Sequence, residues 1–235
     1  MAITRLAACL LLMFQVAGCG SDPTGAGPLL KSAVSGLTGG EDDGTPQAGP
    51  PPGSAPRLTR AQVEAAGAPM IRIRLENENA ISLMTAQARN GPYTTYLSKF
   101  TQSLTLRGTL VTASRGMGYD LLAVDARASD PLVTPRPLAE WPARLQRIYR
   151  FPGNGPRGES LLVTCGYRPG EVLSIEIVGI TYTGRQVEEV CEGESVSFVN
   201  DLFVEEETGF VWRSFQWLGP QQGRVDVEIL APDRS

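Results

Sequence analysis

The chain contains no histidine, and this absence limits the chemistry that its other residues can perform. Catalytic sites that use imidazole as the general base are excluded, and so are metal sites with histidine ligands. Carboxylates are plentiful, in the runs Glu188–Glu189 and Glu205–Glu207, and a glycosidase needs two that converge. Neighbouring residues of a strand point to opposite faces, so neither run supplies such a pair by itself. Only a pair assembled from different strands would support an enzyme that processes polysaccharides.

Arginines gather in residues 136–168, and acidic side chains gather in residues 171–207. One interpretation makes the arginines, above all Arg144, Arg147 and Arg150, a contact for an anionic polysaccharide or a partner protein. The other is ion pairing between the two segments across neighbouring strands. We favour ion pairing, because opposite charges commonly face each other in paired strands.

Trp212 and Trp217 lie in an apolar stretch that begins at Phe210. Exposed aromatic faces are typical of carbohydrate-binding surfaces, so both tryptophans are candidates for contact with a glycan or a partner. Buried packing is the commoner fate of tryptophan in a strand this apolar. The sequence predicts no catalytic residue, no metal site and no cofactor.

The first nineteen residues predict export from the cytoplasm. Arg5 precedes an apolar run over residues 6–14, and the small residues before Cys19 complete the pattern of a signal peptide over residues 1–18. Val-Ala-Gly-Cys resembles the lipobox of bacterial lipoproteins, in which the cysteine becomes the lipidated first residue. We therefore expect acyl chains on Cys19 to anchor the protein in a membrane. In the sorting pattern that this resembles, Gly20 in place of Asp favours the outer membrane.

Residues 19–56 then read as a tether. Between residues 20 and 56, 16 of 37 positions are Gly or Pro and none is aromatic, so the segment cannot bury enough apolar surface to fold. The folded domain is expected over residues 57–235. Its two cysteines, Cys165 and Cys191, would lie in the oxidising periplasm, which predicts a disulfide between them.

The folded part shows mainly the period-two alternation of half-buried strands. Ile71, Ile73 and Leu75 alternate with charged residues, and a similar alternation surrounds Val227 near the other end. A capping box at Thr59 predicts a short helix over residues 60–66. Further strands are expected over 81–88, 93–99, 103–114, 145–151, 160–167, 172–183, 186–191, 196–204 and 210–218, with Pro169-Gly170 and Thr183-Gly184 among the turns. About ten strands and one or two short helices predict an all-β fold, an antiparallel curled sheet with a barrel-like or sandwich shape.

Several motifs together resemble the YjbF/GfcB family, outer-membrane lipoproteins of exopolysaccharide and group 4 capsule loci. Besides the lipobox and the spacer, they are the stretch Leu106–Asp125, Arg147–Phe151, Cys165, Val-Glu-Glu-Val-Cys ending at Cys191, Asn200, and Trp212–Gln216. The resemblance implies an antiparallel β fold and an accessory role in polysaccharide secretion, beside an outer-membrane β-barrel partner. It implies no catalytic residue.

The sequence thus predicts a lipoprotein on the periplasmic face of the outer membrane of a Gram-negative bacterium. It would assist export or assembly of an exopolysaccharide or capsule by binding a partner or a glycan, not by catalysis. Two alternatives stay open: a lipid or lipoprotein carrier with an apolar cavity in the curled sheet, and a polysaccharide-processing enzyme with paired carboxylates. Nucleic acid is an unsuitable partner for a chain with a pI near 5.1.

Overall fold

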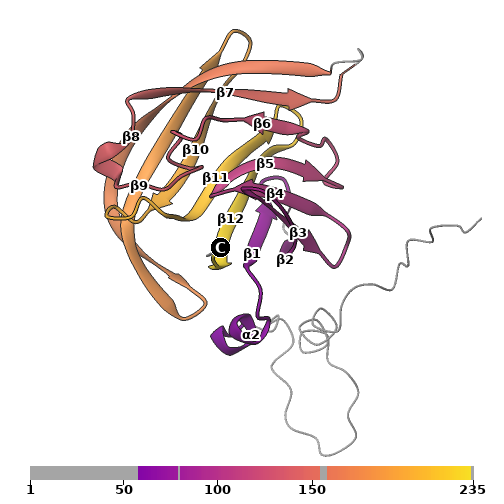
Figure 1. Ribbon diagram of the computed structural model, residues 1–235, viewed down its shortest axis with the longest axis vertical. Helices are drawn as coiled ribbons and strands as arrows, with labels where there is room; N and C mark the ends of the chain where they lie inside the picture. Colours follow the sequence, from indigo (N-terminus) through magenta and orange to yellow (C-terminus); the bar gives the residue numbers. More distant parts are fainter. Residues whose placement is uncertain (1–57, 79, 154–157, 234–235) are drawn as a thin grey trace, which may run out of the picture. The chain divides into compact units, whose positions relative to one another are not determined.

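The computed structural model describes residues 58–78, 80–153 and 158–233. These residues belong to one compact unit, which forms a single antiparallel sheet of twelve strands curled into a nearly closed barrel (Figure 1). The elements are α2 (Arg60–Ala65), β1 (Met70–Leu75), β2 (Ile81–Asn90), β3 (Tyr93–Ser98), β4 (Ser103–Arg107), β5 (Leu110–Arg115), β6 (Ala123–Asp125), the 3-10 turn η1 (Leu138–Glu140), β7 (Arg144–Phe151), β8 (Glu159–Ile177), β9 (Ile180–Gly193), β10 (Ser197–Val204), β11 (Val211–Gly219) and β12 (Gly223–Ala231). The predicted all-β, antiparallel architecture is confirmed.

The first and last strands along the chain, β1 and β12, meet in the middle of the sheet, and the edges of the sheet are β5 and β6. Figure 1 shows β1 beside β12, and these two strands pair from Met70 to Leu75 in an antiparallel ladder. At the edges of the sheet, β5 approaches β6 through Ser114 and Leu121. The Ser114 amide donates to the Leu121 carbonyl at 2.9 Å, and the Leu121 amide donates to Ser114 Oγ at 2.9 Å. A regular ladder of paired residues therefore joins β1 to β12, whereas the edges at β5 and β6 are held together by the hydrogen bonds between Ser114 and Leu121.

The predicted alternation of apolar and charged residues is confirmed, and its apolar side chains face the interior of the barrel. Ile71 pairs with Ile229 and Ile73 pairs with Val227 across β1 and β12, and all four side chains are buried. They belong to one large apolar cluster that extends around the barrel from β1 to β12. Buried side chains from strands all around the sheet contact one another in this cluster, so the described barrel contains a packed apolar core.

The predicted single strand over residues 103–114 is wrong, because the chain turns at Gly108. Strands β4 and β5 form a hairpin there, and Gly108 has a φ of +61°. A Cβ at this position would lie 2.4 Å from the carbonyl oxygen of Leu132, so only glycine fits. The contact with a residue far along the chain explains why local pattern could not reveal the turn.

The predicted turns at Pro169-Gly170 and Thr183-Gly184 are also wrong. Both pairs lie within the long strands β8 and β9, and the chain reverses instead at Val178-Gly179, where both φ angles are positive. Pro169 borders a bulge, where a missing N–H is tolerated. The position of Gly184 inside the sheet requires glycine, because a Cβ there would lie 2.5 Å from the Val204 carbonyl oxygen.

Helix α2 fastens the tip of the β8–β9 hairpin to the barrel. Its capping box is formed as predicted, with the Thr59 hydroxyl accepting from the Gln62 amide. The Arg60 guanidinium donates to the carbonyls of Ile177 (3.0 Å), Val178 (3.3 Å) and Leu230 (2.8 Å). One side chain therefore joins the helix, the hairpin tip and the end of β12. Within the described ranges, no helix is both long enough and apolar enough to span a membrane.

Candidate functional site

A buried charge cluster occupies the interior near β7 and β9. The guanidinium of Arg147 donates to Asp130, from Nε to Oδ2 at 2.7 Å and from Nη2 to Oδ1 at 3.0 Å. Its Nη1 donates to Glu189 Oε2 at 2.8 Å. All three side chains are at most 2% exposed. Burial alone would lower the pKa of Arg147, but the attraction of Glu189 and Asp130 outweighs it and raises that pKa.

Asn200 extends this cluster toward β11. Its Nδ2 donates to Glu189 Oε2 at 2.7 Å, and its Oδ1 accepts from the backbone amide of Trp217 at 2.8 Å. The indole of Trp217 stacks on Phe198 with ring centroids 4.2 Å apart. Asn200 thus links the charge cluster to an aromatic core.

Gln216 forms a second polar connection across the interior. Its Oε1 accepts from the amide of Val111 at 2.9 Å, and its Nε2 donates to the carbonyl of Thr109 at 2.7 Å and to Ser214 Oγ at 2.9 Å. Strand β5 lies at the edge of the sheet, so its free backbone groups need partners. Gln216 supplies them from the opposite wall of the barrel.

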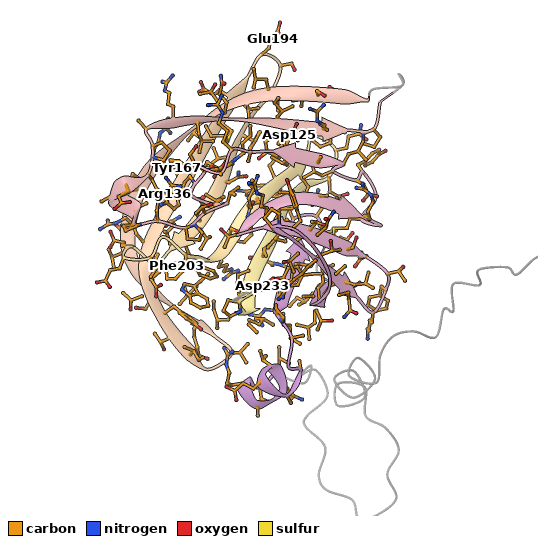
Figure 2. The ribbon with its side chains drawn as sticks, viewed as in Figure 1. Asp125, Arg136, Tyr167, Glu194, Phe203 and Asp233 are labelled. Carbon is orange, nitrogen blue, oxygen red and sulfur yellow. A yellow bond between two sulfur atoms is a disulfide. The ribbon has the colours of Figure 1, made fainter. Side chains whose placement is uncertain are left out.

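Two tyrosines border the charge cluster, and neither phenol is a base near neutral pH. Burial raises the pKa of Tyr149 to about 12. Burial, reinforced by the negative charge of Glu189, likewise raises the pKa of Tyr167. The Tyr167 hydroxyl is buried and has no hydrogen-bond partner within the described ranges. Tyr167 and Arg136, both labelled in Figure 2, are connected by Trp141, whose ring lies 4.7 Å from that of Tyr167 and whose Nε1 donates to the Arg136 carbonyl at 3.0 Å.

The predicted disulfide between Cys165 and Cys191 is confirmed, and it joins β8 to β9 beside the charge cluster. With Glu189, the two cysteines place three potential metal ligands within 4.8 Å of one another. Both sulfurs are consumed by the disulfide, however, and Arg147 engages the carboxylate. This group is therefore a cross-link beside an ion pair and not a metal centre.

The structure separates the five residues that were predicted to contact a glycan or partner. Arg147 and Trp217 lie in the core, so the expectation of a surface contact is wrong for these two. Arg150 is exposed and pairs with Asp125 at 2.7 Å. Trp212 is half-buried against Tyr182, with ring centroids 4.0 Å apart. Arg144 is exposed at the start of β7.

The predicted ion pairing between the arginine-rich and acidic segments holds for one pair. Arg147 binds Glu189, but Arg136, Arg144 and Arg168 pair with no carboxylate in the part of the chain that the structure describes. No local pattern predicted Asp130 as the other partner of Arg147, because Asp130 lies in an irregular, proline-rich connection.

A cleft of about 280 Å³ on the outer face contains two carboxylates and three arginines. Arg213 forms a two-pronged pair with Asp226, with distances of 2.9 and 2.7 Å, and Arg72 pairs with Glu228. Arg74 contacts Asp226 from β1 at 3.4 Å. Burial raises the pKa of Glu228 despite its arginine neighbours. Two acidic side chains therefore lie together in this cleft.

Comparison with known proteins identifies the relatives of this barrel. Residues 30–230 match the family described as group 4 capsule polysaccharide lipoprotein gfcB, YjbF. The chain belongs to this YjbF family. The crystal structure of the hypothetical lipoprotein YmcC from Escherichia coli (K12) is similar to this member, with a TM-score of 0.63 and 18% identity over 76% of this chain and 91% of that chain. At this identity the likeness shows a shared fold. No curated protein matches the chain.

The motifs that suggested the YjbF family converge inside the barrel. Arg147, Glu189, Asn200 and Gln216 come from four of these motifs, and all are buried in the polar connections described above. Their side-chain chemistry therefore serves the closure and packing of the YjbF fold. Membership in a lipoprotein family implies a lipid anchor in a bacterial envelope. The predicted signal peptide, the lipidation site Cys19 and the tether lie outside the described residues.

Proposed function

We propose that this lipoprotein is a non-catalytic accessory of exopolysaccharide or capsule export at the periplasmic face of the outer membrane. It would bind a glycan, or an outer-membrane β-barrel component of the secretion machinery. Membership in the capsule polysaccharide lipoprotein family supports the pathway. Acyl chains on Cys19 would hold the domain at the membrane, and Gly20 favours the outer one.

The observation that carries the non-catalytic role is the state of the interior polar groups. Arg147 engages both buried carboxylates, and Asn200 and Gln216 are occupied by backbone and side-chain partners. A catalytic group must instead be free to exchange a proton or attack a substrate. The packed core likewise offers no support for an acyl-chain carrier, whose interior would have to be hollow and apolar.

Deletion of the gene, followed by complementation, tests this function. We expect loss of extracellular polysaccharide in the deletion strain and its return with the wild-type gene. A Cys19→Ala variant should lose its acyl chains, no longer be retained at the outer membrane, and fail to complement. Normal polysaccharide output after deletion would contradict the proposal. Crosslinking in intact cells should capture an outer-membrane protein with the wild type and not with Cys19→Ala.

The cleft of Asp226 and Glu228 favours one second candidate, hydrolysis of a polysaccharide. A glycosidase uses two carboxyl groups, one of them with a raised pKa, and this cleft has both. Three arginines pair with these two carboxyl groups, however, and a group engaged in this way is not free to transfer a proton to a leaving group. Release of reducing ends from the native polysaccharide by the wild type, abolished in Glu228→Gln, would establish this candidate in place of the binding role.

A further inference from the structure

Two clefts flank the start of β7 and share the exposed side chain of Arg144. The first, of about 340 Å³, lies along the connection before β7, and its lining includes Arg127, Arg136 and Arg144. The second, of about 430 Å³, lies over β8 and β9, and its lining includes Arg144, Tyr167 and Arg168. Both volumes fall in the range of ligand-binding pockets, roughly 300–1,000 Å³.

The arginines of these clefts differ from most others in the protein. Eight arginines among the described residues pair with a carboxylate, and Arg60, Arg107 and Arg115 donate to backbone carbonyls instead. Within the same residues, the remaining four, Arg127, Arg136, Arg144 and Arg168, pair with no carboxylate. The Nε of Arg136 is buried and finds no acceptor among the residues that the structure describes. A buried N–H without a partner costs free energy, which an incoming acceptor recovers. The clefts therefore present unused hydrogen-bond donors and positive charge in a chain of net charge −4.

Acidic residues in the linings do not cancel this charge. Asp130 borders the first cleft, but Arg147 already binds both of its oxygens. Glu140 in the first cleft and Glu192 in the second are exposed and form no ion pair among the described residues. Neutralising the charge of Asp130 would account only for the arginines of the first cleft. Asp130 does not line the second cleft, so the arginines there need another explanation.

We propose that the two clefts form one binding site for an oligosaccharide that carries carboxylate groups. The planar fork of arginine matches a carboxylate with two parallel hydrogen bonds. Tyr167, half-buried and edge-to-face against Trp141, lines the second cleft beside Arg168, so part of its ring borders the space that a sugar would occupy. Because the two clefts share Arg144, they can take two carboxylate groups of the same oligosaccharide. A single phosphate would occupy only one cleft. This inference rests on the proposed function and names the ligand class for it.

Calorimetric titration of the purified full-length protein in detergent tests the site. The probes are hexagalacturonate, neutral maltohexaose and inorganic phosphate. We expect hexagalacturonate to bind and maltohexaose not to bind. Arg144→Gln, which touches both clefts, should weaken binding at least about tenfold, as loss of a charge-assisted contact does. Lys99→Gln removes one positive charge from the exposed β3–β4 turn and should stay within about twofold of wild type.

Three results would overturn the inference: equal binding of the neutral hexamer, unchanged affinity in Arg144→Gln, or phosphate that binds as tightly as hexagalacturonate. Arg144 is exposed, so a thermal melt of Arg144→Gln should match the wild type and exclude misfolding. The same variant is then tested for polysaccharide export in the deletion strain. Loss of binding with normal export leaves the site valid and contradicts the glycan-binding form of the proposed function, whereas normal binding with failed export contradicts the site.

Discussion

The guanidinium of Arg147 and the carboxylate of Glu189, 42 residues apart in the chain, meet at 2.8 Å inside the barrel. Neither side chain is exposed to solvent. The charge of Arg147 is shared between Glu189 and Asp130, so the three residues form one unit. Removing one member leaves a buried charge without its partner, which is far more costly than losing a surface ion pair.

We therefore expect Arg147→Met to lower the free energy of unfolding by about 3–5 kcal/mol. The matched control is Arg150→Met on the same strand, because Arg150 pairs with Asp125 at the surface. Such an exposed pair contributes at most about 1 kcal/mol. Urea denaturation of both variants measures the difference, and similar losses would contradict the buried cluster.

Gln216 should stabilise the edge strand β5. In Gln216→Ala the buried amide of Val111 and the carbonyl of Thr109 lose their partner, and each unsatisfied group costs about 1–3 kcal/mol. Hydrogen exchange should therefore accelerate at the Val111 amide more than at amides of the central β1–β12 ladder. The exposed Gln87→Ala serves as the control and should leave exchange at Val111 unchanged.

Glu228 and Glu76 should shift stability with pH in opposite directions. Burial raises the pKa of Glu228, so its stabilising contribution is complete below the unfolded-state pKa and is lost as the pH rises through the folded-state value. A hydrogen bond from Arg224 lowers the pKa of Glu76, so its contribution is present at higher pH and is lost as the pH falls.

Glutamine substitutions measure these two contributions. Between about pH 4 and about pH 7, Glu228→Gln should gain stability relative to the wild type, and Glu76→Gln should lose it. Urea unfolding at the two pH values gives both differences. A shift of the same sign in both variants would contradict the assigned environments. Glu76 is exposed, so its effect should be the smaller one.

The disulfide should stabilise the barrel because it lowers the conformational entropy of the unfolded chain. Cys165 and Cys191 are 26 residues apart, and a cross-link of this span contributes about 3–4 kcal/mol in the chain-entropy model. The double variant Cys165→Ala and Cys191→Ala should lose about this amount in urea denaturation. The wild type with dithiothreitol should fall to a similar value, and unchanged stability under reduction would show that the cross-link contributes nothing.

The sequence predicted those features whose causes are local. The capping box at Thr59 and the alternation around Ile73 depend on neighbours in the chain. The turns at Gly108 and Val178 did not follow from local pattern. Pro169 and Gly184 carried stronger turn signals, but distant strands place them inside a ladder. The number of strands changed with those turns, from about ten to twelve.

The candidate site was harder to predict for the same reason. Arginine at a surface and arginine in a core have the same sequence signal when the partner is distant. Arg147 is buried because Asp130 and Glu189 reach it from separate segments, while Arg144, three residues earlier, meets no carboxylate and stays exposed. Only the folded arrangement distinguishes these two arginines.

The pairing of β1 with β12 has a consequence for export across the inner membrane. Strand β1 is among the earliest folded residues to emerge from a translocation channel, yet its second neighbour, β12, emerges last of the twelve strands. The barrel therefore cannot finish folding before β12 has crossed the membrane. Until then, the edge of β1 that pairs with β12 stays unpaired. Periplasmic chaperones that cover exposed strand edges would therefore act on β1 before β12 emerges.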